Sequence, residues 1–311
     1  MEKTLGIDVG ATKIEWALSR GGKIEKGAKI NTPHSKKLLL ILKKIIKVSG
    51  AREVGVCLPG FVQKEKASLL PNICGVKNID VKAELGKAGG AKIFVENDAK
   101  CAALALWRKR GMKKDDDFAL VMPGSGIGGA IVRGGRLVRG SGNCAGEFGH
   151  MKFLYFGGGA NKISAGVAGS KNFFEWEQIC GGKGIEKKFD SVVRRNGANK
   201  SKILRKKSAK EIFESKSALE KKVAGEAAEF FGVGMANIAN ALNPKEIIVA
   251  GSLSNAYMGK HKKQVMRTFS QNAIEPAKKV RITKCSLKNP SLAGALLLCK
   301  KERKINSFLG L

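Results

Sequence analysis

Short apolar runs alternate with amphipathic segments along most of the chain. Apolar runs rich in β-branched residues and bounded by Gly, Pro or Asn are typical of buried strands, and apolar positions recurring every three or four residues are typical of helices. This pattern predicts strands at residues 53–57, 92–95 and 246–250. It predicts helices at residues 36–48, 98–110, 224–242 and 291–301. Strands that alternate with helices indicate an α/β protein.

Polar residues mark the ends of these helices. Asn97 or Asp98 is the expected N-cap of the second helix, since either side chain can accept a hydrogen bond from an amide of the first turn. Asn243-Pro244 ends the third helix, because proline cannot continue a helix. The last helix carries Leu and Ala at helical spacing, and we expect it to pack back on the N-terminal part of the chain.

Two segments of the chain resemble one another when Gly10 is laid over Gly124. Both read as a strand, a turn of small residues, a second strand and a pair of glycines, Gly21-Gly22 in one and Gly134-Gly135 in the other. Glycine pairs permit positive φ and suit hairpin turns. The repeat predicts two similar lobes.

Composition limits the class of protein. The chain has 311 residues, 43% hydrophobic and 27% charged, with 39 Gly against 7 Pro, which excludes a disordered chain and a collagen. No apolar run reaches the roughly 18 residues of a membrane span, and the first residues lead into a strand rather than a signal peptide. The 7 cysteines form no C-x-x-C pair, as expected of reduced thiols. We therefore expect a cytoplasmic protein.

The chain is strongly basic. Lys and Arg number 58 against 26 acidic residues, giving a formal net charge of +32, so nucleic acid is a partner to consider. The charge is spread along the sequence, which favours an ordinary solvated surface. The densest stretch, residues 183–222, is interpreted in the same way, as a solvated helix face or loop. The less favoured alternative is that this stretch binds a polyanion such as nucleic acid or polyphosphate.

The two small-residue turns of the repeat could each bind a phosphate. Gly10-Ala11-Thr12-Lys13 offers amides, a hydroxyl and an ammonium group, and residues 124–129 offer a second set of amides. Each turn alone would more often be a plain hairpin, but a matched pair suits the phosphates of a nucleotide held from two sides, with Asp8 as acceptor for metal-bound water. Neither turn has the P-loop pattern or opens a helix, which argues against the P-loop and Rossmann folds.

Three acidic residues and a histidine are candidates for chemistry on a hydroxyl. Glu96-Asn97-Asp98 lies where a strand runs into a helix, and a carboxylate there can accept the proton of a substrate hydroxyl. The alternative is a plain helix N-cap. Glu147 and His150 stand three residues apart in a glycine-flanked segment, where both could reach a polyhydroxylated ligand. Otherwise they are ordinary surface residues.

Together these segments resemble the ROK (repressor, open reading frame, kinase) family of actin-like sugar kinases, in family order from residue 5 to about residue 255. The matching segments are Gly6 to Lys13 (with Ala11 where Gly is usual), Leu58-Pro59-Gly60, Pro71-Asn72-Ile73, Asn97-Asp98, Gly124 to Gly129, Gly146 to Met151, and Asn243 to Ser252.

The resemblance implies an α/β, actin-like (ribonuclease H-like) fold of two lobes around a central cleft. We place the small lobe at residues 1–110 plus 291–311 and the large lobe, which would supply a homodimer interface, at residues 111–290. It also implies transfer of a phosphoryl group from ATP, with Mg²⁺, to a hexose hydroxyl. A glucokinase or broad hexokinase is the leading expectation, and kinases for fructose or N-acetylmannosamine are open alternatives.

The resemblance also assigns roles to residues. Asp98 would be the general base. The sugar would contact Gly60, Asn72, Asn97, Glu147, His150 and Glu177. ATP, with Mg²⁺ near Asp8, would contact Asp8, Gly10, Ala11, Thr12, Lys13, Gly124, Ser125, Gly126, Gly128, Gly251 and Ser252.

The main departure from the family concerns zinc. Family members usually follow the Glu-x-x-His element with C-x-C-G-x-x-G-C-x-E, whose cysteines join the His on a structural Zn²⁺. Matching the last Glu to Glu177 puts Ala168, Ser170 and Glu175 at the cysteine positions, and these cannot form a thiolate site. We therefore expect no structural zinc, which leaves His150 for the sugar. An alternative register puts Glu175 in the place of Glu177.

The sequence leaves two other functions open. A sugar-responsive repressor of the same family would need an N-terminal helix-turn-helix, for which a first strand starting at Leu5 leaves no room. A non-catalytic sugar-binding member would be compatible with Ala11 and the missing cysteines. Intact Asp98, Glu147 and residues 124–129 argue against it.

Overall fold

The computed structural model describes residues 3–21, 23–33, 36–63, 66–69, 77–154, 173–195, 206–300, 305–306 and 309. By their internal contacts the residues group into two compact units, each described here by itself. The first unit consists of Met1–Leu120, Ala130–Gly146 and Ser286–Leu311, and the second consists of Val121–Gly129 and Glu147–Cys285. This grouping assigns residues 111–120 and 130–146 to the first unit, whereas the expected lobes divide at residues 110 and 290.

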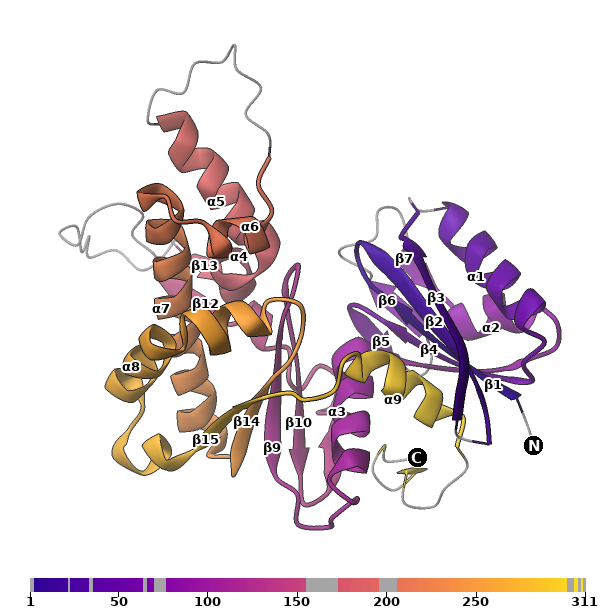
Figure 1. Ribbon diagram of the computed structural model, residues 1–311. Coiled ribbons are helices and arrows are strands. Elements are labelled where there is room, and N and C mark those ends of the chain that lie inside the picture. Colours follow the sequence, from indigo (N-terminus) through magenta and orange to yellow (C-terminus); the bar gives the residue numbers. More distant parts are fainter. Residues whose placement is uncertain are drawn as a thin grey trace. The chain divides into compact units, whose positions relative to one another are not determined.

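The first unit is built on a five-stranded sheet with the order β3-β2-β1-β4-β8 (Figure 1). Its strands are β1 (Lys3–Val9), β2 (Lys13–Arg20), β3 (Lys23–Asn31), β4 (Glu53–Leu58) and β8 (Lys92–Asn97). β1 is antiparallel to β2 and parallel to β4, and β4 is parallel to β8. The parallel strands β1, β4 and β8 therefore end at the same side of the sheet, and the predicted Asp8, Gly60 and Asn97-Asp98 lie at or just after these strand ends.

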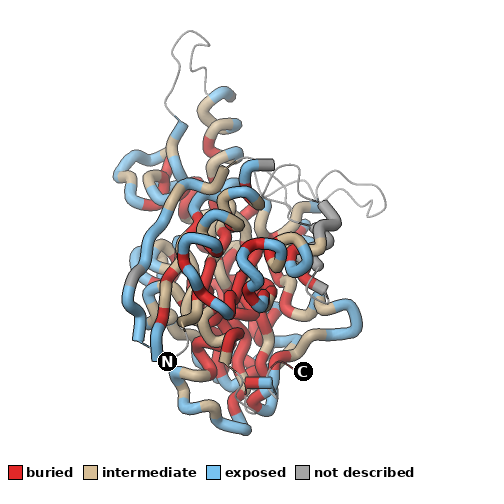
Figure 2. Tube along the Cα trace, turned by 90° about the vertical axis from the view of Figure 1, so that its right-hand side faces the viewer, coloured by how far each residue is buried: buried red, intermediate tan, exposed pale blue. Residues whose placement is uncertain are grey.

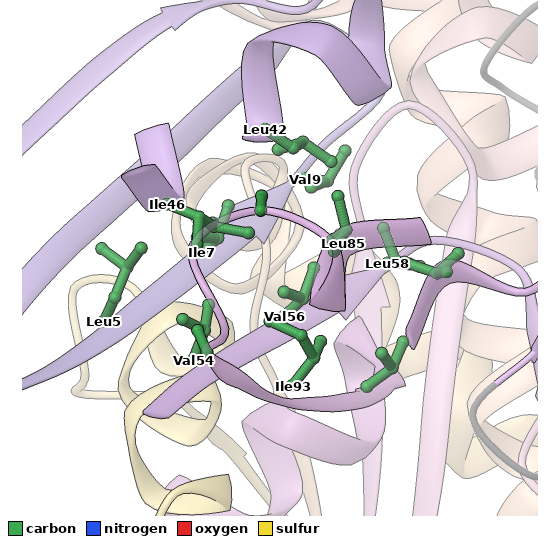
Figure 3. Packing of buried hydrophobic residues seen from close by; sticks show 14 of the residues in the cluster. Leu5, Ile7, Val9, Leu42, Ile46, Val54, Val56, Leu58, Leu85 and Ile93 are labelled. Carbon is green, nitrogen blue, oxygen red and sulfur yellow. The ribbon is translucent and has the colours of Figure 1, made fainter. Parts of the chain in front are cut away.

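One face of this sheet carries the main hydrophobic core of the first unit. Side chains at alternate positions of β1, β4 and β8 meet those of α1 (Lys36–Ser49) and α2 (Val81–Gly86) (Figure 3). The core includes Leu5, Ile7, Val9, Leu42, Ile46, Val54, Val56, Leu85 and Ile93. All nine are at most 2% exposed. Alternate residues of the strands and one stripe of α1 thus face this core, as strand and helix geometry requires.

The opposite face of the sheet is covered by α9 (Pro290–Leu298), which contacts β1, β4 and α3 (Asp98–Lys109). Glycines permit this close approach. A Cβ on Gly55 would lie 1.8 Å from the carbonyl oxygen of Ala295, and a Cβ on Gly294 would lie 1.9 Å from that of Cys101. The last helix thus packs back on the N-terminal strands, as predicted. A small sheet of β5 (Phe61–Gln63), β6 (Lys66–Leu69) and β7 (Lys77–Ile79) follows Gly60.

A second five-stranded sheet has the order β11-β10-β9-β14-β15. Its strands are β9 (Phe118–Pro123), β10 (Ile127–Arg133), β11 (Arg136–Val138), β14 (Glu246–Val249) and β15 (Arg281–Lys284). β9 and β10 each contain residues of both units. The second unit adds the short pair β12 (Lys152–Leu154) and β13 (Phe173–Glu175), the turn of helix η1 (Phe148–His150), and the helices α4 (Trp176–Cys180), α5 (Gly182–Arg195), α6 (Ala209–Glu214), α7 (Ala218–Leu242), η2 (Ala256–Lys260), α8 (Lys262–Asn272) and η3 (Glu275–Lys279).

The core of the second unit contains a stack of aromatic rings. Trp176 of α4 stacks on Phe231 of α7 with ring centroids 5.3 Å apart, and Phe231 stacks on Tyr257 at 4.0 Å. Gly234, one turn along α7, leaves room for the indole, since a Cβ there would lie 2.1 Å from a carbon of the Trp176 ring. The stack fixes α4 against α7, and α4 carries Glu177.

The predicted helices and strands are confirmed, with shifts at their ends that have local causes. α7 starts at Ala218, earlier than residue 224, because its polar first turns hide the apolar period. It ends at Leu242, where Asn243 adopts a left-handed φ of 43°. In Figure 2 buried and exposed residues alternate around the coils of the helices, as expected of helices that pack one face against a core.

The described residues include six cysteines, none of them in a disulfide. No helix in the described part of the chain combines the length and apolar character that crossing a membrane requires.

Candidate functional site

The first phosphate-type turn joins β1 to β2. The Gly10 amide donates to the carbonyl of Lys13 at 2.9 Å, and the Thr32 hydroxyl donates to the carbonyl of Gly10 at 2.6 Å. A Cβ on Gly10 would lie 2.9 Å from the Lys13 oxygen, so the turn needs glycine there. Ala11 is not among the described non-glycine residues with positive φ, so its methyl group causes no backbone strain. Thr12 and Lys13 are exposed and available to an anion.

Asp8 lies two residues before this turn, in register with Cys57 of β4. The Cys57 thiol donates to the Asp8 carboxylate at 3.2 Å. Burial raises the pKa of Asp8, and hydrogen bonds from Cys57 and Asn289 oppose that rise. A carboxylate oxygen is the type of ligand that Mg²⁺ prefers, and a cation beside it would favour the ionised form. The residue therefore fits the metal-binding role predicted for it.

Asn97 and Asp98 connect β8 to α3. Asn97 is 4% exposed and is the N-cap of α3, its side-chain oxygen accepting from the Lys100 amide at 3.1 Å. Its side-chain amide donates to the carbonyl of Gly60 at 3.0 Å. Asp98 is the first residue of the helix and is partly exposed, and one of its carboxylate oxygens accepts from the Ala99 amide at 2.8 Å. Asn97 is therefore the N-cap, and Asp98 is the acidic residue of the first turn, where a carboxylate is favourable.

The structure thus brings together three of the predicted residues in the first unit: Gly60, Asn97 and Asp98. Gly60 has a φ of 93°, a backbone angle that residues with a side chain rarely adopt, so the turn after β4 depends on glycine. Asn72, a predicted sugar contact, lies outside the described residues.

The second phosphate-type turn lies between β9 and β10 and is braced by the junction of α4 and α5. The Gly124 amide donates to the Gly126 carbonyl at 2.9 Å. At the junction, the amides of Gly182 and Lys183 donate to the carbonyls of Gly124 and Ser125 at 2.8 and 2.9 Å. The first amides of a helix are its unpaired donors, so the start of α5 is anchored on this turn.

Gly251 and Ser252 follow β14 next to the same turn. A Cβ on Gly251 would lie 2.6 Å from the Pro123 carbonyl oxygen, and one on Gly124 would lie 3.6 Å from the Ser252 hydroxyl. The structure therefore groups the predicted nucleotide-side residues of the second unit, with Gly128 one residue into β10.

A histidine and two glutamates form a cluster in the second unit. Ligand atoms of His150, Glu175 and Glu177 all lie within 4.8 Å of one another. His150 Nδ1 lies 3.2 Å from one Glu175 oxygen, and Lys152 Nζ lies 2.7 Å from the other. The pKa of Glu175 is lowered, chiefly by the hydrogen bond from Lys152; burial opposes this, and the hydrogen bond from His150 lowers the pKa further.

Glu177 contacts the second phosphate-type turn. One of its oxygens accepts from the Ile127 amide at 3.2 Å, and a Cβ on Gly126 would lie 2.3 Å from that oxygen. The family resemblance matches either Glu177 or, in the alternative alignment, Glu175 to the sugar contact, and both carboxylates lie beside His150. Glu147 stands at the start of η1, just before this cluster.

The cluster does not resemble a structural zinc site. Its ligand atoms are one imidazole and two carboxylates, and a Lys152 ammonium and an Ile127 amide already bind the carboxylates. Ala168 and Ser170, the other positions matched to cysteines, lie outside the described residues. The expectation of no structural zinc stays a prediction.

Sequence reasoning missed several polar residues beside these groups. The sequence gives no signal for Lys152, because its pairing with Glu175 depends on two three-residue strands that have no recognisable sequence pattern. The sequence also gives no signal for a group of residues connected through hydrogen bonds to Glu96 and Asn97, because each has the character of a surface residue. These are Lys100, Arg139 and Asn143.

The chain is similar in sequence and in fold to known proteins. The family model described as "ROK family" matches residues 4–302. A glucokinase of Halalkalibacterium halodurans is 27% identical over 81% of this chain and 81% of that protein. An N-acetyl-D-glucosamine kinase of Histophilus somni is 29% identical over 80% of this chain and 84% of that protein. The crystal structure of a ROK family glucokinase from Streptomyces griseus in complex with glucose and AMPPNP has a TM-score of 0.76 at 23% identity, covering 96% of this chain and 100% of that chain.

Proposed function

Because the chain belongs to the ROK family, with its α/β sugar-kinase fold, we propose that it is a kinase that transfers a phosphoryl group from ATP to a hexose hydroxyl. The observation that carries the proposal is the start of α3. Asn97 is fixed to the Gly60 carbonyl at 3.0 Å, and the next residue, Asp98, carries a partly exposed carboxylate at the start of the helix. The relatives named above are sugar kinases, and the S. griseus structure contains glucose and an ATP analogue.

Asp98 is the general base in this proposal. Its carboxylate accepts the proton of the sugar hydroxyl while that oxygen forms a bond to the γ-phosphorus. The bond between the γ-phosphorus and the bridging oxygen breaks, and its electron pair leaves with ADP. Such catalysis consists mainly of positioning and charge stabilisation, so a carboxylate held at a helix start meets the main requirement.

The other residues bind and orient the substrates. Amides of the turns at residues 10–13 and 124–129, with the Thr12 hydroxyl, the Lys13 ammonium and Ser252, hold the phosphates. Asp8 would hold Mg²⁺, which when bound neutralises charge on the phosphates. Gly60, Asn72 and Asn97 in the first unit bind sugar hydroxyls.

In the second unit, Glu147, His150 and Glu177 bind sugar hydroxyls, and Glu175 orients the imidazole of His150. Glucose is the first substrate to test. Fructose, mannose and the N-acetylated hexosamines are the alternatives, because one pocket group can decide among them. We further propose a cytoplasmic homodimer.

The test is coupled ADP release from purified protein with MgATP and a panel of glucose, fructose, mannose, N-acetylglucosamine and N-acetylmannosamine. Turnover on at least one sugar is expected. Asp98→Asn should lower kcat by about 10²- to 10⁴-fold, the usual contribution of a general base, while sugar binding measured by calorimetry stays close to that of the wild type. Unchanged turnover in Asp98→Asn would refute the base. Sugar binding without any turnover would instead favour a non-catalytic regulator.

A further inference from the structure

A buried ammonium group lies two residues after the proposed base. Lys100 is 1% exposed, the lowest exposure of any charged residue described in the chain. Its Nζ donates to the side-chain oxygen of Asn143 at 2.8 Å and to the backbone oxygen of the same residue. Lysine is rarely buried completely, because removing its charge from water is costly unless its hydrogen bonds are replaced. An exposed lysine would be equally compatible with a helix at this position. Helix formation alone therefore does not explain why Lys100 is buried.

Asn143 is the centre of the contacts around this lysine. Its side-chain oxygen accepts from both Lys100 and Arg139 Nη1, the latter at 2.9 Å, and its side-chain amide donates to the carbonyl of Val62. Its φ is 58°, in the left-handed region that asparagine tolerates better than most residues. Both the side chain and the backbone of Asn143 are thus committed to holding its neighbours.

Arg139 extends the network to the end of β8. Its Nη2 donates to Glu96 at 2.7 Å, and its Nε donates to the carbonyl of Leu309 at 2.7 Å. The other Glu96 oxygen accepts the backbone amide of Asn97 at 2.8 Å. Glu96 is 5% exposed, so this ion pair is shielded from water on the carboxylate side. Such charge-assisted hydrogen bonds are the stronger kind.

The network joins three segments of the first unit. It contacts β8 and the start of α3 through Glu96 and Lys100, the strand after Gly60 through Val62, and residues 139–143 through Arg139 and Asn143. The hydrogen bond from the Asn97 side-chain amide to the Gly60 carbonyl is a second, direct connection between the start of α3 and the turn at Gly60. Neither Lys100 nor Asn143 needs to touch a substrate to hold the Gly60 turn and Asp98 at a fixed separation.

We propose that Lys100, Asn143 and Arg139 are positioning residues that hold the Asp98 carboxylate and the Gly60 turn in register for proton removal from the sugar hydroxyl. The proposal rests on the proposed kinase function. Its physical basis is that a misplacement of about 1 Å can reduce a rate about 10²-fold. The phosphate-type turn at residues 10–13 has its own hydrogen bonds, to Thr32, so the network should affect kcat and the KM for sugar but not the KM for MgATP.

The experiment compares three substitutions in the purified full chain. Lys100→Met keeps the length of the side chain and removes the ammonium. Asn143→Gly keeps the left-handed backbone and removes the side chain, whereas Asn143→Asp keeps the oxygens that bind Lys100 and Arg139. The matched control is Lys43→Met, which breaks another lysine contact of the same unit, to Glu84 at 2.9 Å, away from Asp98.

We expect kcat to fall at least 10-fold in Lys100→Met and Asn143→Gly, at a temperature where circular dichroism shows both to be folded, with the KM for MgATP within 2-fold of the wild type. Asn143→Asp should recover only part of the loss, because it keeps the oxygens that bind Lys100 and Arg139 but cannot donate to the Val62 carbonyl. Lys43→Met should keep the wild-type kcat. Equal kcat in all variants, or equal loss in Lys43→Met, would overturn the proposal.

If Lys100→Met does not fold, the proposal is tested by the kcat of Asn143→Gly against that of Asn143→Asp. Equal kcat in these two variants would overturn it. A wild-type protein that turns over none of the sugars refutes the kinase function instead. Hydrogen exchange then tests the anchoring itself: unchanged exchange of the Ala99 and Lys100 amides in Asn143→Gly would overturn it, and faster exchange would support it.

Discussion

An alanine at position 55 would place its methyl group in the contact between β4 and α9. The Cβ would lie 1.8 Å from the carbonyl oxygen of Ala295 and 2.8 Å from its carbonyl carbon. Both are backbone atoms of a helix, so no flexible side chain can move aside. Either α9 shifts away from the sheet or β4 bends. β4 leads directly to Gly60, so the substitution should also disturb the turn that Asn97 binds.

The size of the effect follows from the type of clash. Extra methyl groups in a packed core usually cost about 1–3 kcal/mol, and a backbone obstacle on the opposite side puts Gly55→Ala at about 3 kcal/mol or more. At about 2–4 °C of melting temperature per kcal/mol for a domain of this size, the expected decrease is about 6–12 °C. Relief of the clash by movement of α9 would expose Ala295, which is now fully buried.

Scanning calorimetry of Gly55→Ala measures this decrease, and Gly86→Ala is the control. Gly86 is the last residue of α2, and a Cβ there meets nothing within 4 Å. Alanine is the better helix former by about 0.5–1 kcal/mol, so the control should melt at or slightly above the wild-type temperature. A melting temperature of Gly55→Ala within about 2 °C of the wild type would refute the argument from close packing.

Two further predictions concern an exposed carboxylate and a buried ring. Lys87 and Lys43 lower the pKa of Glu84 to about 2, so the stabilisation by this carboxylate should be present above pH 4.5 and decline as the pH falls toward 2. Nuclear magnetic resonance titration of Glu84 should show that low midpoint, and Lys43→Met should move it back toward 4.5. Gly234→Ala should lower the melting temperature of the second unit and weaken the near-ultraviolet circular dichroism of Trp176, because its Cβ would stand 2.1 Å from the indole. An unchanged spectrum would contradict that packing.

Much of the fold is predictable because its central strands contain short apolar runs. β4 is buried at every position and β8 contains the run Ile93-Phe94-Val95, and each strand ends at or just before a turn or cap residue, Gly60 or Asn97. Asn97 also marks the start of α3 through its own capping chemistry. These signals are local, so a single sequence is enough to read them.

Other parts of the structure depend on contacts that leave no local signal. α5 begins at Gly182, just before the Lys-rich stretch of residues 183–222. The charged residues of α5 give no hint that the amides of Gly182 and Lys183 bind the turn at Gly124 and Ser125. The burial of Lys100 is equally hidden, because its partner Asn143 is distant in sequence and lies in an irregular segment. Sequence reasoning therefore proposes reactive groups but not the residues that hold them.

The two phosphate-type turns differ in how they are held, although their sequences repeat. The Gly10 turn is fixed within its own sheet by Thr32, whereas the Gly124 turn is held by α5 and by the carboxylate of Glu177. Glu177 belongs at the same time to the cluster with His150, whose ligand atoms lie within 4.8 Å. A sugar hydroxyl that drew on the Glu177 carboxylate would compete with the Ile127 amide and so act on the turn. In the second unit, the Glu177 carboxylate thus links the proposed sugar contacts to the turn that carries the proposed phosphate contacts. Through this carboxylate, the binding of one substrate would influence the binding of the other.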